Sequence, residues 1–228
     1  MCGRFGLLPP REDVEERFDA RITFDYEPRA NIAPEGPGVP AKLNESPDEI
    51  NRLRWGLLPR WVDDPDGFPD LINARAETVA EKSSFEDAFE NRRCLIPASN
   101  FYEWSGQRGK RVPHYIGVED GELFAMAGLW ETWSDNGTEI QSATIITTEA
   151  NELVDEIHGR MPVILDRDEE DRWLEADDED ELQALLDPYP AGRMETYEVS
   201  RAVNNPANEG PELVEPVGSD QTGLGEFG

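Results

Sequence analysis

Short segments that alternate apolar and polar residues run through most of the chain, and they predict β-strands. Segments 39–43 and 50–55 alternate on either side of a turn-forming stretch, so we expect them to pair with each other. Residues 29–34 are also expected to be extended. Further strands are expected over 92–98, 113–118, 123–130, 139–147, 163–165 and 194–199.

Helical spacing occurs mainly at the edges of these segments. Val14 and Phe18 lie four residues apart behind a Pro-Pro pair, which predicts a helix over 11–20. Further helices are expected over 84–91 and 151–157. Two acidic surface helices are expected from residue 166 onward, with one apolar face that includes Trp173 and Leu182.

These elements favour an α+β fold with a mainly antiparallel, barrel-like β-sheet and peripheral helices. The chain lacks a long βαβ alternation and a phosphate-binding glycine loop, which are the marks of parallel nucleotide-binding folds. We expect a single domain over 2–205. Residues 206–228 are rich in Gly, Pro and acidic residues and are expected to form a tail.

The formal net charge of −29 is extreme for 228 residues. Such a charge often marks a disordered chain, but six Trp and nine Phe argue for a packed core. Abundant Asp and Glu with only three Lys (Lys42, Lys82 and Lys110) resemble the composition of proteins from salt-loving organisms. Salt screens self-repulsion, so the acidity is interpreted as an adaptation to the solvent. A nucleic-acid partner would then have to be bound by a local group of arginines.

Cysteine and histidine are scarce, which limits the classes of site. The two cysteines, Cys2 and Cys94, give neither a disulfide framework nor a metal-binding spacing, and the histidines are only His114 and His158. We therefore expect no metal and no cofactor, and a reducing cytoplasm as the location. Cys94 is expected to be a small core residue. The chain has no apolar run near 18 residues and no signal-peptide pattern.

The first residues, Met-Cys-Gly-Arg-Phe, carry the most distinctive chemistry. If Met1 is removed, Cys2 bears an α-amine and a thiol on neighbouring carbons. This pair condenses with an aldehyde: the amine forms a Schiff base and the sulfur then closes a five-membered thiazolidine ring. An α-amine in a free peptide has a pKa of about 7.7–8.0, so a useful fraction is neutral and nucleophilic near neutral pH.

Two further residues have alternative interpretations. Glu103 lies among three aromatic residues, so it is either shielded from water, which raises a carboxyl pKa, or points outward from an alternating strand. Trp61 precedes a loop rich in Asp, Pro and Gly. It either folds back onto the core or stays exposed and stacks on a nucleic-acid base.

Several motifs occur together in a fixed order along the chain. They are Cys-Gly-Arg-Phe at 2–5, Asn-Ala-Arg-Ala-Glu-Thr at 73–78, Arg-Cys-Leu-Ile-Pro-Ala at 93–98, Phe-Tyr-Glu-Trp at 101–104 and His-Gly-Arg-Met-Pro-Val-Ile-Leu at 158–165. This set resembles the SRAP family, the SOS-response-associated peptidase-like proteins. The resemblance covers residues 2 to about 205.

The resemblance implies a DNA–protein crosslinking activity on single-stranded DNA that carries abasic sites. Cys2 would trap the aldehyde of the ring-opened sugar as a thiazolidine, as its own chemistry allows. By motif, Asn73 would hold the sugar, Glu103 would move protons, and His158 would act as acid and base in ring opening. Arg4, Arg75 and Arg160 would bind phosphates, and Pro40, Trp61 and Trp104 would stack on or wedge between bases. We expect a monomer that works on the nucleoid and does not bind membranes.

Two alternatives use the same residues differently. A thiol peptidase, or autopeptidase, would use Cys2 as the nucleophile with Glu103 and His158. A non-catalytic single-strand binder would keep the arginines and tryptophans without the chemistry. Methionine aminopeptidase removes Met before a residue as small as Cys, so self-cleavage is unnecessary here. This consideration favours the crosslinker.

Overall fold

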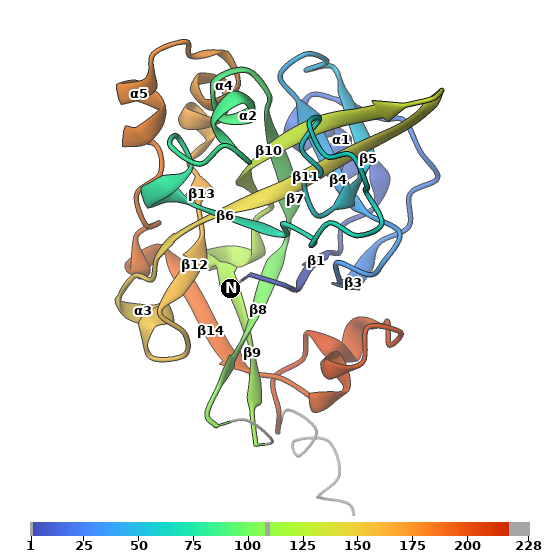
Figure 1. The fold of residues 1–228 in the computed structure, drawn as a ribbon. Helices are drawn as coiled ribbons and strands as arrows, with labels where there is room; N and C mark the ends of the chain where they lie inside the picture. The colour runs from blue at the N-terminus through green and yellow to red at the C-terminus, as the bar shows by residue number, and fades with distance from the viewer. Residues whose placement is uncertain (1, 108–109, 219–228) are drawn as a thin grey trace, which may run out of the picture.

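Five strands close into a barrel at the centre of the computed structural model, which describes residues 2–107 and 110–218 (Figure 1). These strands are β4 (Val39–Leu43), β5 (Glu49–Trp55), β7 (Arg93–Ala98), β10 (Phe124–Asp135) and β11 (Thr138–Glu149). Their pairings are antiparallel except at one seam. There β5 and β11 run parallel, with Trp55 opposite Ala143, and this pairing closes the ring.

A second, antiparallel sheet lies against the barrel in the order β14-β9-β8-β1-β3. Its strands are β1 (Phe5–Leu7), β3 (Arg29–Ile32), β8 (Asn100–Ser105), β9 (Val112–Val118) and β14 (Met194–Glu198). Four short strands extend the barrel sheet: β2 (Arg21–Ile22), β6 (Asn73–Arg75), β12 (Arg160–Pro162) and β13 (Ile164–Leu165). The predicted class, an α+β fold with a barrel-like antiparallel sheet and peripheral helices, is confirmed.

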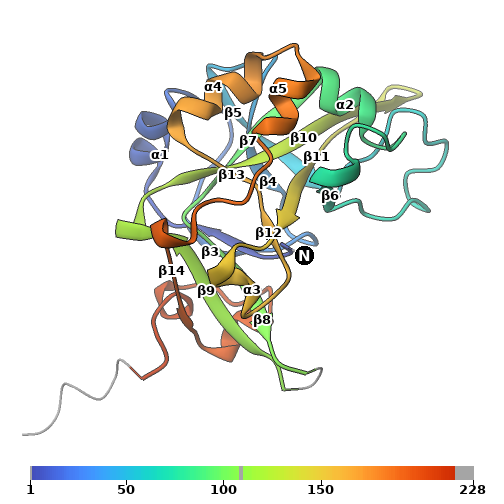
Figure 2. The same ribbon diagram turned by 90° about the vertical axis from the view of Figure 1, so that its left-hand side faces the viewer.

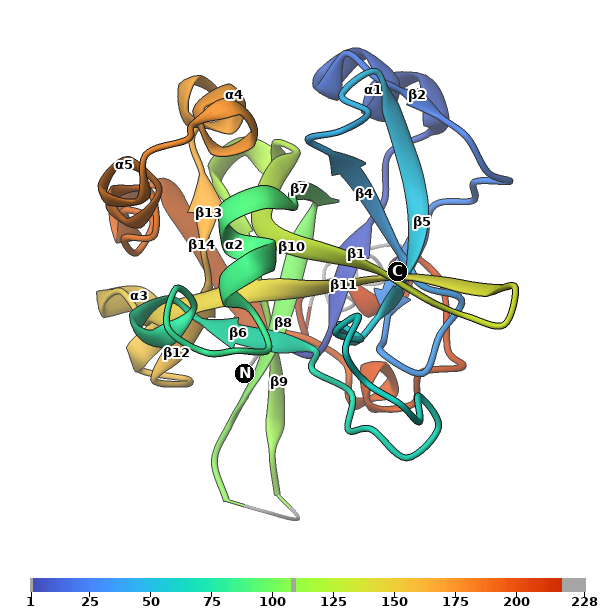
Figure 3. The same cartoon turned by 45° about the horizontal axis from the view of Figure 1, so that its top comes forward.

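The helices are short and lie outside the sheets. They are α1 (Arg11–Phe18), α2 (Glu86–Asn91), α3 (Glu152–Asp155), α4 (Arg167–Glu175) and α5 (Glu179–Ala184). Figures 2 and 3 show α2, α4 and α5 grouped at one end of the barrel. In the described part of the chain, no helix has the length and apolar character needed to cross a bilayer.

The main core includes the start of the chain. Cys2 and Phe5 have no exposed surface, and the Phe5 ring packs edge-on against Trp55 with 5.3 Å between centroids. Cys94 is also fully buried in this core, as expected. The N-terminal segment is therefore a fixed part of the structure, and Cys2 has a defined position.

Two sequence-based boundaries differ from the structure. The helix expected over 151–157 is shortened to α3. The Asn151 side chain caps its start by accepting hydrogen bonds from the N–H groups of Leu153 and Val154. At its other end the Ile157 N–H donates to the Val154 carbonyl, a tighter turn that ends the α-helical pattern. The expected tail is partly packed. Within 206–218, Leu213 is fully buried against a second apolar cluster that contains Tyr102 and Tyr115, and residues 219–228 lie outside the described residues.

Candidate functional site

Cys2 lies where the barrel meets the second sheet. Figures 1 and 3 show the N-terminal side of β1 beside β6 and β8. On the barrel side, the Asn73 side-chain N–H donates to the Cys2 carbonyl oxygen at 3.0 Å. On the other side, the Tyr102 N–H donates to the Arg4 carbonyl at 2.9 Å, and Phe5 pairs with Phe101. Both contacts restrict the main chain around Cys2.

Asn73 begins β6, which runs parallel to β11 with Asn73 opposite Ile145. Its amide nitrogen is used by Cys2, whereas its Oδ1 atom is buried and accepts no hydrogen bond from the described residues. A buried amide oxygen without a donor is unfavourable unless a ligand or water supplies one. Asn73 thus combines a hydrogen bond to Cys2 with a buried acceptor atom that has no donor among the described residues.

Glu103 lies on β8 and is only 4% exposed. Of the two interpretations that the sequence allowed, the shielded carboxyl is the one the structure shows. Extending the β1–β8 register places Gly3 opposite Glu103, so the carboxyl belongs to the strand that flanks Cys2. Burial raises the pKa of the Glu103 carboxyl, and the nearby His158 offsets part of this effect.

The Cys2 thiol is affected by the same environment. Burial, and after it the charge of Glu103, raise the pKa of the thiol to about 12. The sulfur therefore stays protonated at neutral pH and is not a ready nucleophile. It needs a neighbouring group to accept its proton when it reacts, and the carboxylate form of Glu103 can do so.

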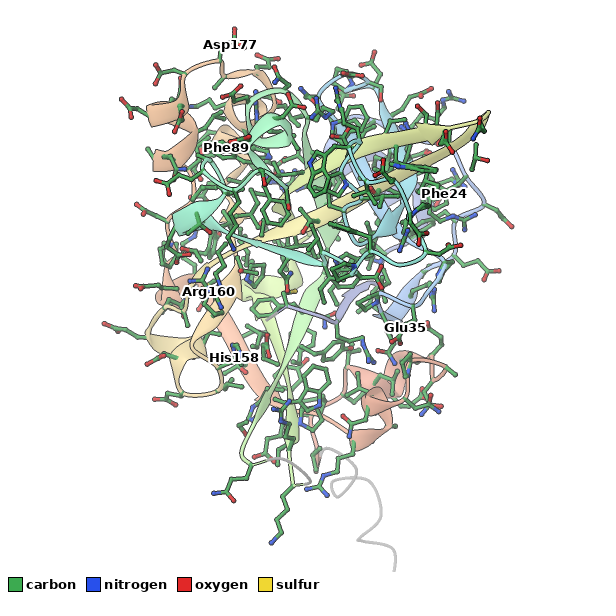
Figure 4. The ribbon with its side chains drawn as sticks, in the orientation of Figure 1. Phe24, Glu35, Phe89, His158, Arg160 and Asp177 are labelled. Atoms are coloured by element: carbon green, nitrogen blue, oxygen red, sulfur yellow. The ribbon has the colours of Figure 1, made fainter. Side chains whose placement is uncertain are left out.

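His158 lies in the segment that leads into β12, and Arg160 is the first residue of that strand. Both are labelled in Figure 4, on the side of α3 and β12, across the molecule from Glu35. The imidazole is oriented through Nδ1, which lies 3.1 Å from the Arg160 backbone nitrogen and 3.2 Å from its carbonyl oxygen. The Arg160 guanidinium forms a two-point ion pair with Glu77, with Nη2 to Oε2 at 3.0 Å.

The other expected phosphate-binding arginines differ in exposure. Arg75 ends β6 and is exposed. Arg4 is partly buried and donates to Asn31 at 2.8 Å and to the Val203 carbonyl at 2.6 Å, with its guanidinium 5.9 Å from the Trp104 ring centroid. Burial lowers the pKa of Arg4. Arg4 supports Trp104, whereas Arg75 is open to a ligand.

The expected base-contacting residues occupy three different places. Trp104 follows Glu103 on β8 and donates from its indole nitrogen to Asn204 at 2.7 Å. Trp61 is 55% exposed, so the exposed alternative is the one the structure shows, and its ring meets Phe68 edge-on. Pro40 is buried in β4 and lines a separate pocket of about 460 Å³ that includes Phe24.

The structure thus brings Cys2, Asn73, Glu103 and His158 together from the segment before β1, from β6, from β8 and from the α3–β12 connection. Sequence reasoning missed the supporting partners, chiefly Glu77 and Asn204. Glu77 stands in the Asn-Ala-Arg-Ala-Glu-Thr motif, and an acidic residue in an otherwise arginine-bearing motif is a signal that could have indicated an ion pair.

The chain is similar to proteins of known family over nearly all its length. A family model described as SOS response associated peptidase (SRAP) matches residues 1–206. The chain is 43% identical over 222 residues to abasic site processing protein YoqW of Bacillus subtilis, covering 94% of this chain and 99% of that one. It is 33% identical over 229 residues to abasic site processing protein YedK of Escherichia coli, covering 95% of this chain and 100% of that one.

Similarity extends to animals and to a solved structure. Abasic site processing protein HMCES of Xenopus tropicalis is 32% identical over 266 residues, with coverage of 95% of this chain and 78% of that one. The crystal structure of a protein from Bacteroides thetaiotaomicron matches with a TM-score of 0.86 at 28% identity, covering 94% of this chain and 99% of that one. The family match and these relatives confirm the resemblance seen in the motifs, and the chain belongs to the SOS response associated peptidase (SRAP) family.

Proposed function

We propose that this protein processes abasic sites in single-stranded DNA by capturing them covalently on Cys2 once Met1 has been removed. The observation that carries the proposal is the fixed position of Cys2, which is fully buried and whose carbonyl accepts a hydrogen bond from Asn73. The charge of the buried Glu103 also acts on its thiol. The names of the relatives in bacteria and Xenopus, all abasic site processing proteins, support the same substrate.

The first step opens the sugar and joins it to the amine. An abasic deoxyribose is a closed hemiacetal in equilibrium with an aldehyde at C1′. His158 moves a proton from the C1′ hydroxyl toward the ring oxygen, which opens the ring. The Cys2 α-amine adds to the aldehyde carbon and gives a carbinolamine. The unpartnered Oδ1 of Asn73 accepts a hydrogen bond from a sugar hydroxyl and holds it there.

The second step closes the thiazolidine. Protonated Glu103, whose pKa is raised by burial, donates a proton to the carbinolamine hydroxyl, and water leaves with formation of the iminium. The Cys2 sulfur then bonds to the iminium carbon while its proton passes to the Glu103 carboxylate. One water is released overall, and Glu103 returns to its starting state. The raised pKa of the thiol favours this order, with the amine reacting first.

A denaturing-gel experiment tests the proposal. The processed protein, with its start at Cys2 verified by mass, is mixed in molar KCl with single-stranded DNA that carries one abasic site. No borohydride is added. We expect a heat-stable shifted band with the wild type and none with Cys2→Ala. Cys2→Ser retains the amine and should give a band only when borohydride traps the Schiff base.

Two matched controls test which cysteine reacts and whether the Cys2 α-amine is required. Cys94→Ala removes the other cysteine, which is buried in the core, and should crosslink like the wild type. A chain with one alanine inserted before Cys2 keeps the thiol but turns the Cys2 nitrogen into an amide, and should not form a heat-stable band. Crosslinking by this inserted chain, or by Cys2→Ala, would overturn the proposal.

The proposal also includes that the protein acts as a monomer and in the cytoplasm.

A further inference from the structure

Asn31 is a fully buried asparagine that uses both ends of its side-chain amide. It lies on β3, which pairs with β1 in the second sheet. Its Oδ1 atom accepts a hydrogen bond from Nη1 of Arg4 at 2.8 Å. Its Nδ2 atom donates to the carbonyl oxygens of Asn205 and Asn208, each at 3.0 Å, and to that of Val203 at 3.3 Å. One buried side chain therefore joins the start of the chain to a segment near its end.

The segment that accepts these hydrogen bonds, residues 201–208, is called the C-terminal turn here. It begins with the 3₁₀ turn η4 (Arg201–Asn204). The Asn208 side chain donates to the Ala202 carbonyl at 2.9 Å, and the Asn208 N–H donates to the Asn205 carbonyl at 3.0 Å, so the turn is closed on itself. Figure 1 shows this segment, in red, below β3 and beside the β8–β9 hairpin. The turn can therefore serve as a fixed support for the strands beside it.

Arg4 connects Asn31 to the reacting residue. It lies two residues after Cys2 and directly before β1. Its Nη1 atom donates to Asn31 and also to the Val203 carbonyl at 2.6 Å, while its backbone carbonyl accepts from the Tyr102 N–H at 2.9 Å. The Nε atom is buried without a hydrogen-bond partner among the described residues, so the guanidinium is oriented through Nη1. Loss of the Nη1 contacts would release the chain two residues from Cys2.

The position of Asn31 calls for an amide. An amide offers an acceptor to the Arg4 cation and donors to the carbonyls of the C-terminal turn at the same time. An aspartate has no donor for those carbonyls, and an apolar residue satisfies neither side. A buried donor or acceptor that loses its partner costs about 1–3 kcal/mol. The contacts on both sides of Asn31 therefore depend on this one side chain.

We propose that Asn31 is a positioning residue for the reaction of Cys2. Through Arg4 it ties residues 2–4 to the C-terminal turn, and this tie holds Cys2 in its buried place beside Glu103. The turn is then a working part of the site, although Val203 lies 199 positions from Arg4 in the sequence. The inference rests on the proposed function, because it concerns the geometry of the same reaction.

Thiol labelling without DNA tests the tie separately from the chemistry. The Met1-processed protein is treated with iodoacetamide in molar KCl, and the labelling of each cysteine is followed by peptide mass spectrometry. Cys2 reports release of the N-terminal segment, whereas Cys94 reports opening of the core. Both should be labelled slowly in the wild type, because burial raises the pKa of each thiol and shields it. In Asn31→Ala we expect Cys2 to react about tenfold faster or more, with the Cys94 rate within about threefold of the wild type.

A second variant removes the other partner of the same contact. Arg4→Met leaves the C-terminal turn bound to Asn31 and should also release Cys2, so the test stands even if Asn31→Ala does not fold. Equal acceleration of Cys2 and Cys94 would mean that Asn31 only supports overall stability, and an unchanged Cys2 rate would mean that it holds nothing. Either result overturns the proposal.

Asn44→Ala is the matched control. Asn44 also uses both ends of its amide, donating to the Asn91 carbonyl at 3.0 Å and accepting from the Trp130 indole at 3.0 Å, but it lies after β4 in the barrel sheet. Its loss should leave the rate of Cys2 labelling, relative to that of Cys94, at the wild-type value. A selective release of Cys2 by this control would contradict a specific role for Asn31.

A double-mutant cycle tests whether Asn31 acts through Arg4. The readout is the single-turnover rate of crosslinking to abasic single-stranded DNA at saturating DNA. Asn31→Ala and Arg4→Met should each slow the reaction about 10- to 100-fold, because Cys2 is no longer held in place. The double variant should be no slower than the slower single variant, since both changes break one contact. Multiplied losses would show that Asn31 acts independently of Arg4 and would overturn the proposed route.

The two experiments keep this inference distinct from the proposed function. Failure of the wild type to crosslink an abasic strand would overturn the proposed function. The labelling rates of Cys2 and Cys94 would still decide whether Asn31 holds the N-terminal segment in place.

Discussion

At the scale of single residues, Glu103 has opposite effects on stability and on the proposed chemistry. Its carboxyl is buried, and burial raises its pKa. The folded state therefore binds this proton more tightly than the unfolded state does. Stability from this group is present below the ordinary Glu pKa, about 4.3, and is lost as pH rises through the folded pKa. An ionised Glu103 is thus unfavourable for folding but useful as a proton acceptor.

Replacing Glu103 by Gln should separate these two effects. Glu103→Gln should slow crosslinking about 100-fold or more, because the proton donor and acceptor is lost. The same variant should be more stable than the wild type at pH 7, and this gain should shrink as the pH falls toward 4. Urea unfolding in molar KCl at several pH values, beside single-turnover crosslinking rates, measures both. A variant that is slower but less stable at every pH would contradict a destabilising buried carboxylate.

Residue identities in the site were accessible from the sequence, but their environment was not. The chemistry of Cys2 follows from an α-amine beside a thiol, and the motif order pointed to Asn73, Glu103 and His158. Whether Glu103 faced inward or outward was undecidable from Phe-Tyr-Glu-Trp, because aromatic residues on both sides of it satisfy either face of a strand. The burial of Glu103 in the folded protein settles the direction.

At the scale of elements, the short 3₁₀ turn η1 (Ala76–Thr78) contacts β12 through Arg160, which we propose as a phosphate ligand. Glu77 lies in that turn and forms the ion pair with Arg160 at the start of β12. The hydrogen bond that the Arg160 side chain donates to Glu77 lowers the pKa of this carboxyl, so Glu77 is ionised at neutral pH and the ion pair persists. A carboxylate on this guanidinium competes with any phosphate that would bind there.

Glu77→Gln should therefore strengthen DNA binding. The variant removes one negative charge beside Arg160 and its two-point ion pair, while the hydrogen bond from Arg160 to the Thr147 carbonyl remains. We expect about three- to tenfold tighter binding, at 0.1 M KCl, of a single-stranded oligonucleotide that carries tetrahydrofuran in place of the abasic sugar. Glu12→Gln removes the same charge at an exposed position on α1, outside the elements that carry the site, and serves as the control. Weaker or unchanged binding by Glu77→Gln would show that the ion pair positions Arg160 for the phosphate instead of blocking it.

The sequence predicted those elements that are long enough to show a repeating pattern of apolar and polar residues. The long strands β10 and β11 and the helix α1 appeared close to their expected ranges. The three-residue strands β1, β6 and β12 did not, since three residues cannot show a period of two and their partners are distant in sequence. These are also the strands that carry the site.

The pairing of distant segments explains the remaining differences. Residues 206–218 have the composition of a tail, yet Glu209 forms an ion pair with Arg29, and Leu213 fills a gap beside Tyr102. Local composition cannot report a contact between residues 180 positions apart. The same holds for Glu77 and Arg160, which are 83 positions apart.

At the scale of the whole molecule, the charge of −29 makes the stability of the protein sensitive to ionic strength. Mutual repulsion of the acidic residues destabilises the compact state at low ionic strength. The Debye length falls from about 10 Å at 0.1 M to about 3 Å at 1 M salt, so molar salt screens that repulsion. Exposed ion pairs oppose this repulsion and contribute about 0–1 kcal/mol each.

Stability should consequently rise with salt. Between 0.1 and 1 M KCl, we expect the free energy of unfolding to increase by at least about 1 kcal/mol, or about 2–4 °C in Tm for a chain of this size. Thermal unfolding followed by circular dichroism in KCl and in NaCl measures it, and a screening effect should be the same for both cations. A decrease with salt would mean that ion pairs outweigh repulsion.

The central claim is a covalent bond that uses both the amine and the sulfur of Cys2, and intact-mass measurement of the crosslinked product tests it most directly. The account predicts a mass equal to the processed protein plus the DNA minus one water, with no added hydrogen after borohydride. Denatured and alkylated with iodoacetamide, the product should show one reactive thiol, that of Cys94, against two in the free protein. A product that gains two hydrogens from borohydride, or that keeps two reactive thiols, would contradict the thiazolidine and leave an ordinary Schiff base.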